Sequence, residues 1–385
     1  MVTSPFPPLL PEQQAACDAL TRQLADEIAA EGGAIPFSRF MERALYAPQY
    51  GYYTGGAHKI GRDGDFVTAP LLSPLFAQTL ARQLAQILPQ TDGNVYEFGA
   101  GTGVLAAQLL NALSGSLKHY YIVELSPELA ERQRRYLQQH APEHAHKAVH
   151  LTALPEYFDG VIIGNEVLDA MPVERITRAA DGSWQQAFVA WENDGFVPQL
   201  RPLASPVLLQ AAAQYFPPQP DYTSELHPAQ YAFVHTLAQK LRRGGMIWLD
   251  YGFDAAQYYH PQRQDGTLIG HHRHHTVHDP FFRVGLTDLT AHVNFTDIAQ
   301  AATDAGLDLI GYTTQGRFLL NAGITECLAQ SCPDPQSPAY FQAAAAVNVL
   351  TAQHEMGELF KVIAFGKDTD PDWLGFAIGD LCHKL

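Results

Sequence analysis

The sequence predicts an α/β fold, in which a mostly parallel sheet carries helices on both faces. The first observation is a short apolar segment, Val95–Phe98, followed by glycines at positions 99, 101 and 103 and then by an Ala/Leu-rich stretch. This order is typical of a buried strand that turns tightly into a helix. The second is that strand-like and helix-like segments alternate beyond residue 91, which indicates parallel strands joined by crossover helices.

Seven short apolar segments account for the sheet, because each is bounded by turn residues or helical patterns. These predicted strands are Val95–Phe98, Tyr120–Val123, Ala148–Leu151, Gly160–Gly164, Met246–Leu249, Leu307–Tyr312 and Phe360–Phe365. The predicted helices show apolar residues at helical spacing, and several begin at proline or end at glycine. They are Pro11–Ala30, Pro36–Tyr46, Leu75–Leu88, Thr102–Leu113, Pro127–Gln139, Ala229–Leu241 and Phe295–Ala305.

The domain organisation follows from these segments. Residues 1–90 are expected to form an N-terminal helical extension with a loop near the cleft, and residues 91–385 the ligand-binding domain. Two insertions interrupt this domain, at about 173–228 and 251–290. The first contains a hairpin signal, and the second is a long, His-rich loop. Loops of such length are commonly lids or binding loops, so we expect both insertions to cover the cleft.

The composition excludes several classes of protein. Of 385 residues, 46% are hydrophobic and 17% charged, as in ordinary globular proteins. The net charge of −16 disfavours a nucleic-acid partner and favours a basic protein or peptide. Four scattered cysteines without a C-x-x-C pair predict neither disulfides nor structural zinc. Because no basic residue precedes Arg22 and no long apolar segment occurs, we expect a cytoplasmic protein without signal peptide, presequence or membrane insertion.

The glycine spacing indicates the kind of cofactor. A dinucleotide fingerprint, G-x-G-x-x-G, needs a small residue where this chain has Val104. The spacing G-x-G-x-G after Glu97 instead resembles the first motif of class I methyltransferases that bind S-adenosylmethionine. Glu97 suits the cationic methionine end of that cofactor, and Glu124, at the end of the next strand, suits its ribose hydroxyls. The alternatives are a glycine turn without a ligand and a solvent-exposed Glu124.

The string GNEVLDAMPVER brings Asn165, Glu166 and Asp169 to the carboxyl end of the fourth predicted strand, where ligands bind in such sheets. Many amine methyltransferases have Asn/Asp-Pro-Pro followed by an aromatic residue here, and only Asn165 matches. Two carboxylates can instead hold a guanidinium in bidentate fashion. We therefore treat these three residues as candidate catalytic residues. The alternative is that Glu166 caps a local helix while Asp169 pairs with Arg175.

A histidine-rich stretch, GHHRHHTVHDP, occupies residues 270–280. We predict no metal there, because adjacent histidines in a loop rarely converge on one centre; a solvated or substrate-facing loop is expected. Downstream, Asp288, Thr290, His292 and Asn294 alternate with apolar residues, which predicts a strand with one polar face. If that face borders the cleft, His292 is a further candidate catalytic residue; a half-exposed strand is the alternative.

Seven blocks occur in the order seen in MidA-type methyltransferases, which are S-adenosylmethionine-dependent enzymes of bacteria and mitochondria. They are GYYTGG, GDFVTAPLLSPLF, EFGAGTGVLAAQLL, YYIVELSPELAERQ, GNEVLDAMPVER, LDYGF and DLTAHVNF. The chain resembles this family from about Gly33 to Lys367. The resemblance implies a class I methyltransferase fold with a seven-stranded sheet. It also implies protein arginine N-methylation linked to respiratory complex assembly, because mitochondrial members methylate an arginine of a complex I subunit.

Motif and resemblance together give a set of expected S-adenosylmethionine contacts. They are Glu97, Gly99, Ala100, Gly101, Thr102, Gly103, Glu124, Leu125, Ser126, Asn165, Thr68, Pro70 and Ser73, and Asp65 is expected to return over the cleft with the last three. The chain departs from the family pattern at Asn294, at Leu71–Leu72 and in the dense HHRHH run. These departures bear on the substrate more than on the cofactor.

The expected partner is a protein with an exposed arginine. Two alternatives stay open at this point: a small-molecule N- or O-methyltransferase whose pocket is closed by residues 251–290, and an S-adenosylmethionine-binding assembly factor with little turnover. The sequence leaves the number of methyl groups and the oligomeric state open.

Overall fold

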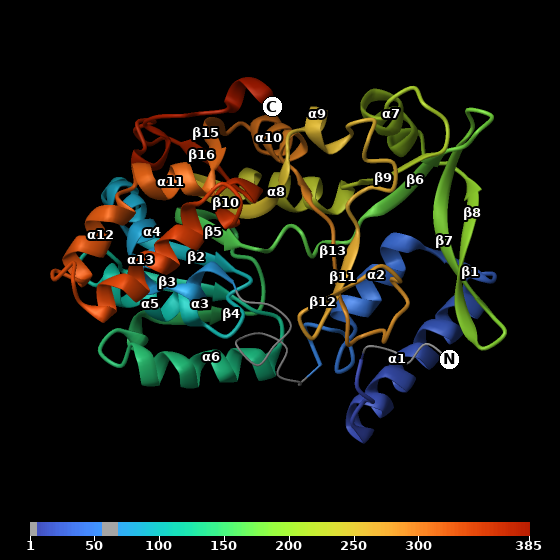
Figure 1. Ribbon diagram of the computed structural model, residues 1–385, viewed down its shortest axis with the longest axis horizontal. Helices are drawn as coiled ribbons and strands as arrows, with labels where there is room; N and C mark the ends of the chain where they lie inside the picture. The colour runs from blue at the N-terminus through green and yellow to red at the C-terminus, as the bar shows by residue number, and fades with distance from the viewer. Residues whose placement is uncertain (1–5, 56–67) are drawn as a thin grey trace.

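The computed structural model describes residues 6–55 and 68–385, and a large sheet dominates it (Figure 1). The strands follow the order β15-β16-β10-β5-β2-β3-β4, and the short β14 adds to β10 as an eighth strand. Only β16 runs antiparallel to its neighbours along this path. The strands are β2 (Asn94–Phe98), β3 (His119–Val123), β4 (Ala148–Leu151), β5 (Phe158–Asn165), β10 (Leu241–Phe253), β14 (Val293–Asn294), β15 (Asp308–Thr314) and β16 (Phe360–Lys367). The predicted fold class is confirmed, and β14 is the one addition to the seven strands predicted for this sheet.

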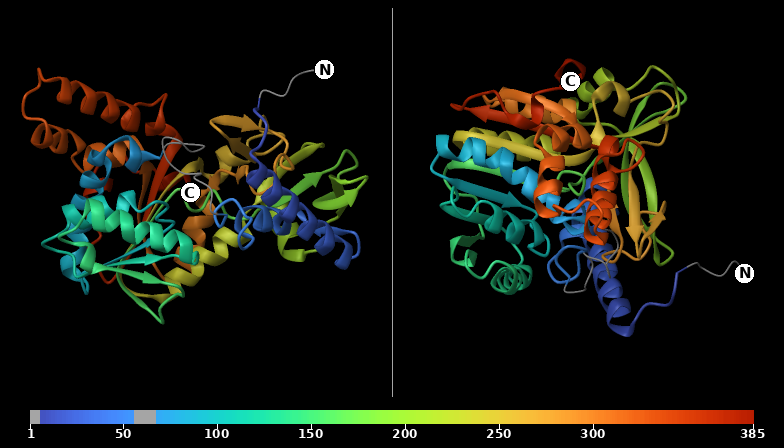
Figure 2. Two further views of the ribbon diagram at one scale, coloured as in Figure 1. Left: turned by 90° about the horizontal axis from the view of Figure 1, so that it is seen from below. Right: turned by 60° about the vertical axis from the view of Figure 1, so that its left-hand side comes forward.

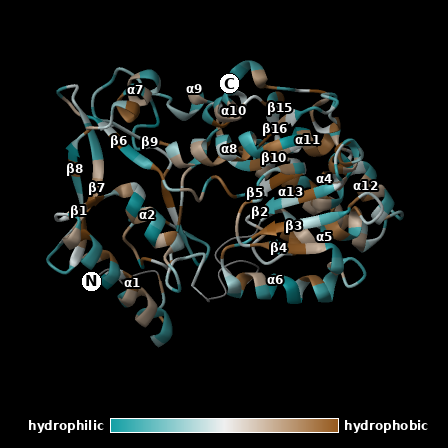
Figure 3. Cartoon of the chain, turned by 180° about the vertical axis from the view of Figure 1, so that it is seen from behind, coloured by the Kyte–Doolittle hydropathy of each residue, from teal (hydrophilic) through white to brown (hydrophobic). Residues whose placement is uncertain are grey.

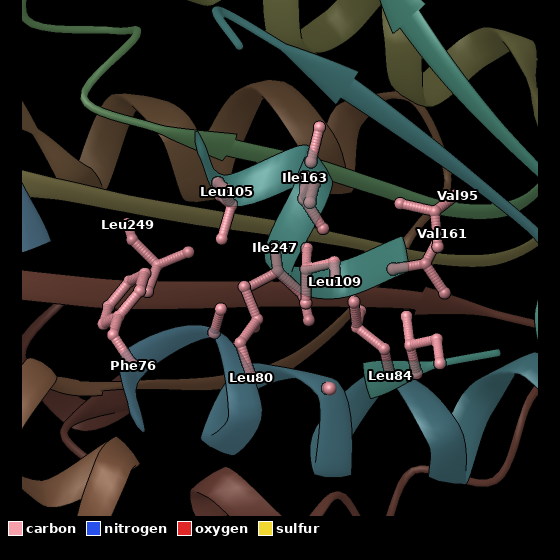
Figure 4. Packing of buried hydrophobic residues seen from close by; sticks show 14 of the residues in the cluster. Phe76, Leu80, Leu84, Val95, Leu105, Leu109, Val161, Ile163, Ile247 and Leu249 are labelled. Atoms are coloured by element: carbon pink, nitrogen blue, oxygen red, sulfur yellow. The ribbon is translucent and has the colours of Figure 1, made fainter. Parts of the chain in front are cut away.

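Alternate residues of the central strands face two different helical layers. On one face, Val161 and Ile247 pack against α4 (Pro74–Ile87) and α5 (Val104–Ala112). Figure 4 shows Phe76, Leu80 and Leu84 of α4 lying along this face. On the other face, Ile162 and Trp248 pack against α8 (Pro228–Lys240) and α10 (Phe295–Asp304). Because both faces are covered, the strands are continuously apolar, which is why the sequence pattern predicts them well.

A second lobe lies beside the large sheet (Figures 1 and 2). It combines α1 (Pro11–Ala30) and α2 (Phe37–Tyr46) with a five-stranded sheet and a small three-stranded sheet. The strands are β1 (Ala34–Pro36), β6 (Glu174–Arg178), β7 (Trp184–Glu192), β8 (Gly195–Pro202), β9 (Tyr222–Leu226), β11 (Ile269–His272), β12 (His275–Val277) and β13 (Asp288–Thr290). Leu24, Phe40, Val189 and Leu289 share one apolar core, so the N-terminal helices and both insertions fold together.

The domain limits expected from the sequence stay a prediction. In the structure, α1 and α2 belong to the second lobe, whereas α4 packs on the large sheet.

Serine side chains begin the helices that flank the cofactor motif: Ser73 Oγ accepts a hydrogen bond from Leu75 N at 3.2 Å, and Ser126 Oγ accepts one from Leu129 N at 3.3 Å. Such caps satisfy backbone donors that the first helical turn leaves free.

α6 (Pro127–His140) matches the helix expected over Pro127–Gln139. The sequence pattern does not single out the remaining helices. They are α3 (Ala69–Leu72), α7 (Pro206–Tyr215), α9 (Ala255–Tyr258), α11 (Gln315–Asn321), α12 (Ile324–Ser331), α13 (Pro338–Thr351) and α14 (Met356–Leu359). Figure 3 shows how hydrophilic α6 is compared with the strands it accompanies. Across residues 6–55 and 68–385, no helix has the length and apolarity of a membrane span.

The expected strand over residues 288–295 is wrong. β13 ends at Thr290, and Ala291 then donates a backbone hydrogen bond to Asp169 O at 3.0 Å. The chain resumes as β14, and Asn294 Oδ1 accepts from Thr296 N at 3.3 Å, which begins α10. Asp288, Thr290 and Asn294 are buried, so a half-exposed strand is wrong as well.

Candidate functional site

The glycine turn after β2 has the backbone that its spacing requires. Gly99, Gly101 and Gly103 have φ values of 67°, 53° and 86°, which L side chains rarely adopt. A Cβ on Gly99 would also lie 2.6 Å from Val167 Cγ2. Gly103 begins α5, and its N–H donates to Ala100 O at 2.8 Å. The turn therefore presents backbone N–H groups and a helix N-terminus without intervening side chains.

A cavity of about 1150 Å³ lies at the carboxyl ends of β2, β3 and β5. Pockets for single drug-sized ligands measure about 300–1,000 Å³, so this one has room for more than one ligand. Most of the expected binding residues line it. They are Thr68, Pro70, Glu97, Gly99, Ala100, Gly101, Thr102, Glu124, Leu125, Ser126, Asn165 and Glu166.

Four expected residues lie outside this lining. Ser73 is buried as the cap of α4, and Gly103 shapes the turn from behind. Asp169 is 5% exposed, and His292 is likewise not among the described lining residues. Asp65 lies outside the described residues.

Glu97 lines the cavity and is 2% exposed. Its Oε2 accepts a hydrogen bond from the Tyr120 hydroxyl at 2.8 Å. Burial raises the pKa of Glu97 to about 8, and the Tyr120 bond opposes this rise. A buried carboxyl with one neutral partner is suited to a cationic group, which would restore its ionised form.

Glu124 is fixed at the end of β3. Its Oε1 accepts from Ser126 N at 2.8 Å, and its Oε2 accepts from Gln133 Nε2 at 3.2 Å. Gln133 Nε2 also donates to Gly101 O at 2.9 Å, so one buried side chain joins the acid to the glycine turn. Burial raises the pKa of Glu124. Gln133 is a site residue that sequence reasoning missed; its signal is its place in the ELSPELAERQ block.

The loop after β5 carries Asn165, Glu166 and Asp169. Glu166 has a φ of 55°, and its Oε1 accepts from Asn165 Nδ2 at 3.0 Å. The loop is held by Asp250, which lies within β10. Asp250 Oδ2 accepts from the backbone N–H groups of residues 167, 168 and 169 at 3.1, 2.9 and 3.3 Å. Asp250 is the second site residue that sequence reasoning missed, although LDYGF is among the family blocks.

The structure excludes the alternative reading of Glu166 and Asp169. Glu166 caps no helix, because none begins at this loop. Arg175 does not pair with Asp169; its Nε lies 3.6 Å from Glu225 Oε1, and its guanidinium also donates to Asp265 O. Within the part of the chain that the structure describes, no salt bridge involves either acid.

The two acids of this loop have raised pKa values. Burial raises the pKa of Glu166 to about 8, and the charge of Asp169 adds to the rise. Burial raises the pKa of Asp169 to about 6, although a hydrogen bond from the Tyr251 side chain opposes it. Among the lining residues that the structure describes, there are four carboxyls and no Lys, Arg or His. This environment favours a cation as the ligand next to Glu166.

His292 and the two insertions do not contribute to the described lining of the cavity. The His292 ring lies against Tyr251 and Phe253, at centroid distances of 5.1 and 5.2 Å, and burial lowers its pKa to about 4. His292 is not among the described lining residues, and its catalytic role stays a prediction. The expectation that the insertions cover the cleft is wrong for this cavity, because they form the sheets of the second lobe. From the second lobe, five residues of the segment after α2 line it instead: Tyr46, Pro48, Gln49, Tyr53 and Thr54.

The histidine-rich stretch forms the β11–β12 hairpin, in which His272 contacts Leu286 O and the Arg283 guanidinium at 2.7 and 3.0 Å. Within residues 6–55 and 68–385, no group of three or more His, Cys, Asp or Glu side chains is arranged to hold a metal ion.

Known proteins resemble the chain along most of its length. A relative from Danio rerio, named protein arginine methyltransferase NDUFAF7, mitochondrial, is 28% identical over 89% of this chain and 86% of its own. The Drosophila melanogaster homolog is 27% identical over 90% and 84% of the two chains. A crystal structure of a COG1565 superfamily member from Burkholderia thailandensis, bound to S-adenosyl-homocysteine, is 49% identical with a TM-score of 0.94, and it covers 99% of this chain and 100% of that one. A native structure from the same organism is 48% identical with a TM-score of 0.92.

The family follows from these findings and from the site. Residues 78–313 match the model of the Methyltransf_28 family, whose members are described as S-adenosyl-L-methionine-dependent methyltransferases. The glycine turn, Glu97 and Glu124 fit that cofactor, and a neighbour 49% identical binds its demethylated product. The chain belongs to the Methyltransf_28 family and is an S-adenosylmethionine-dependent methyltransferase.

Proposed function

We propose that this methyltransferase acts on arginine side chains of a protein. The observation that carries the proposal is Glu166, a buried carboxyl at a cavity whose described lining holds acids and no basic side chain. A guanidinium placed there gains a charge partner and hydrogen bonds in one contact, because its planar N–H groups match a carboxylate in bidentate fashion.

Individual residues of the cofactor side have proposed roles. Glu97 pairs with the methionine amine, Glu124 accepts from the ribose hydroxyls, and the turn 99–103 contacts the methionine end with its backbone. Leu125, Ser126, Thr68 and Pro70 line the same cavity and are proposed to flank the cofactor. Bound S-adenosylmethionine supplies an activated methyl group.

Glu166 is proposed to orient the guanidinium so that one nitrogen faces that methyl group, and Asn165 fixes the carboxyl through its 3.0 Å hydrogen bond. Alignment accounts for much of the rate in such displacements. The N–CH₃ bond forms as the S–CH₃ bond breaks, and the nitrogen then releases a proton. Because the proton leaves only after the N–CH₃ bond has formed, no strong base is needed before attack. Glu166 and Asp169 lie nearby and can take up this proton.

Two further observations support a protein acceptor. Relatives that align over most of the chain are named protein arginine methyltransferases. The net charge of −16 favours a basic partner. A role in respiratory complex assembly and a cytoplasmic location stay predictions, as does the division into a cofactor-binding domain and an N-terminal extension.

The experiment uses the purified enzyme, methyl-labelled S-adenosylmethionine and a protein lysate, with mass spectrometry of the labelled peptides. We expect label on arginine, and a loss of at least about 100-fold in Glu166→Gln, while S-adenosyl-homocysteine affinity stays within about threefold. Glu128→Gln is the matched control, because Glu128 also lines the cavity but pairs with Arg132 on the surface. Label on small metabolites alone, or on other residues, would refute the proposal.

A further inference from the structure

Part of the cavity lining comes from outside the cofactor motifs. Tyr46, Gln49 and Tyr53 of the second lobe belong to it, together with Met171 and Pro172. Asn165 and Glu166, in the loop after β5, line the same cavity. The tyrosines therefore share one cavity with the residue proposed to bind the acceptor.

The two tyrosines are fixed in place by contacts that join the lobes. Their rings are stacked, with centroids 5.5 Å apart and planes inclined by 22°. The Tyr46 hydroxyl donates to Ala170 O at 3.0 Å, on the loop that carries Glu166. The Tyr53 hydroxyl lies 3.0 Å from both carboxylate oxygens of Asp288. Since both hydroxyls are occupied, what remains for a ligand is ring surface, and Tyr46 keeps 38% of its surface exposed.

The segment between the tyrosines is held by backbone hydrogen bonds. Gly51 N donates to Ala47 O at 2.8 Å, and Tyr53 N donates to Leu45 O at 2.9 Å, so the segment folds back on the end of α2. A Cβ on Gly51 would lie 2.5 Å from Ala47 N, which only glycine avoids. A wall with this little freedom loses little entropy when a ligand binds.

The electrostatics around Tyr46 and Tyr53 favour a planar cation. Burial of the hydroxyls, with Asp288 and Asp169 nearby, raises the pKa of Tyr46 and of Tyr53 above the usual range, so both rings stay neutral. A neutral aromatic ring attracts a cation, and a planar guanidinium can contact ring and carboxylate together. An ammonium group lacks the planar fork and makes only one of these contacts well.

We propose that Tyr46 and Tyr53 form an acceptor subsite, which seats the guanidinium-bearing side chain of the substrate against aromatic rings while Glu166 binds its nitrogen atoms. The subsite rests on the proposed arginine methylation and specifies it further, because it makes Tyr46 and Tyr53 determinants of specificity. It also gives the second lobe a function, since that lobe supplies Tyr46 and Tyr53 to the cavity lining.

The test measures binding of two small probes to the enzyme saturated with S-adenosyl-homocysteine, by calorimetry or ligand-observed NMR. Agmatine carries a guanidinium on a four-carbon arm, and putrescine carries an ammonium on the same arm. We expect agmatine to bind at least about tenfold more tightly than putrescine. Tyr46→Leu should weaken agmatine by about tenfold, whereas Tyr46→Phe should stay within about threefold, because it keeps the ring.

Tyr157→Leu is the matched control, because Tyr157 is an exposed tyrosine outside the cavity lining. S-adenosyl-homocysteine affinity reports whether each variant is folded, and Tyr53→Leu replaces Tyr46→Leu if the latter fails this check. Unchanged agmatine affinity in the leucine variant, or equal affinity for the two probes, would overturn the subsite. Neither result touches the proposed function, which fails separately if the labelled lysate contains no methylarginine.

Discussion

Replacing Gly99 with alanine tests whether the glycine turn and the Glu166 loop form one packed unit. The substitution has two separable costs. Alanine at a φ of 67° is left-handed, which costs about 1–2 kcal/mol. Its Cβ would lie 2.6 Å from Val167 Cγ2, and overpacking of this kind costs about 1–3 kcal/mol. We therefore expect Gly99→Ala to lower the free energy of unfolding by about 2–5 kcal/mol, the sum of the two costs.

Two other glycines provide matched controls. Gly306 has a φ of 87° with no atom within 4 Å of its ideal Cβ, so Gly306→Ala should show only the conformational cost. Gly115 has neither feature, so Gly115→Ala should change stability by less than about 1 kcal/mol. In a double-mutant cycle, Val167→Ala in the Gly99→Ala background should recover only the steric part of the lost free energy of unfolding.

Urea unfolding gives the stabilities, and calorimetry gives the affinity for S-adenosyl-homocysteine. We expect Gly99→Ala to weaken that affinity at least about tenfold, because any shift that relieves the contact moves the cofactor turn or the loop after β5. The reasoning is refuted if Gly99→Ala costs no more than Gly306→Ala, or if Val167→Ala recovers nothing.

Three further predictions concern the acids of the site. Asp250→Asn should reduce the methylation rate more than about tenfold and leave cofactor affinity little changed, because Asp250 anchors residues 167–169 without lining the cavity. Steady-state kinetics and calorimetry measure the two quantities. Equal losses of methylation rate and cofactor affinity would contradict the prediction. Burial raises the pKa of Glu166 to about 8, above its value in the unfolded chain, so the stability that the protonated carboxyl contributes is lost as pH rises toward 8. The stability of Glu166→Gln relative to the parent should therefore increase by about 3–4 kcal/mol between pH 5 and 8 in unfolding titrations. A flat difference would be evidence against the raised pKa. Tyr120→Phe removes the hydrogen bond that lowers the pKa of Glu97, so its affinity for S-adenosylmethionine relative to the parent should fall at pH 7 and recover toward pH 9. Glu97→Gln should show no such recovery relative to the parent. Identical pH profiles of the two variants would argue against pairing of Glu97 with the methionine amine.

The cofactor side of the site could be predicted from the sequence because its signals are local. Glu97 and the three glycines lie within seven consecutive residues, and Glu124 ends the adjacent strand. Strand, turn and helix follow one another there, so residue spacing alone fixes the geometry. The continuous burial of Val161–Ile163 made the central strands equally evident.

The acceptor side could not be predicted, because its contacts join residues far apart in the chain. Tyr53 reaches Asp288 across 235 positions, and Tyr46 reaches Ala170 across 124. In the sequence, GYYTGG indicates only a structured loop. Asp250 illustrates the same limit: its position at a strand end is predictable, but the three backbone donors that it binds lie more than 80 positions away.

The insertions were misassigned for a related reason. Their length and glycine content are typical of lids, but strand pairing decides where they lie. Ala34 pairs with Ala190, so the first insertion joins the N-terminal segment in one sheet. His292 was proposed from a polar alternation that the structure breaks at Ala291, whose N–H is bonded to Asp169 O. Alternation over a few residues does not exclude two short elements at an angle.

Amino-acid analysis of protein labelled by this enzyme tests the central claim most directly. The purified enzyme, methyl-labelled S-adenosylmethionine and a proteome depleted of small molecules are incubated, and the protein is hydrolysed to free amino acids. We predict that the label co-migrates with methylated arginine and that Glu166→Gln abolishes it while S-adenosyl-homocysteine still binds. Label in methyllysine or another amino acid, or full labelling by Glu166→Gln, would contradict the account.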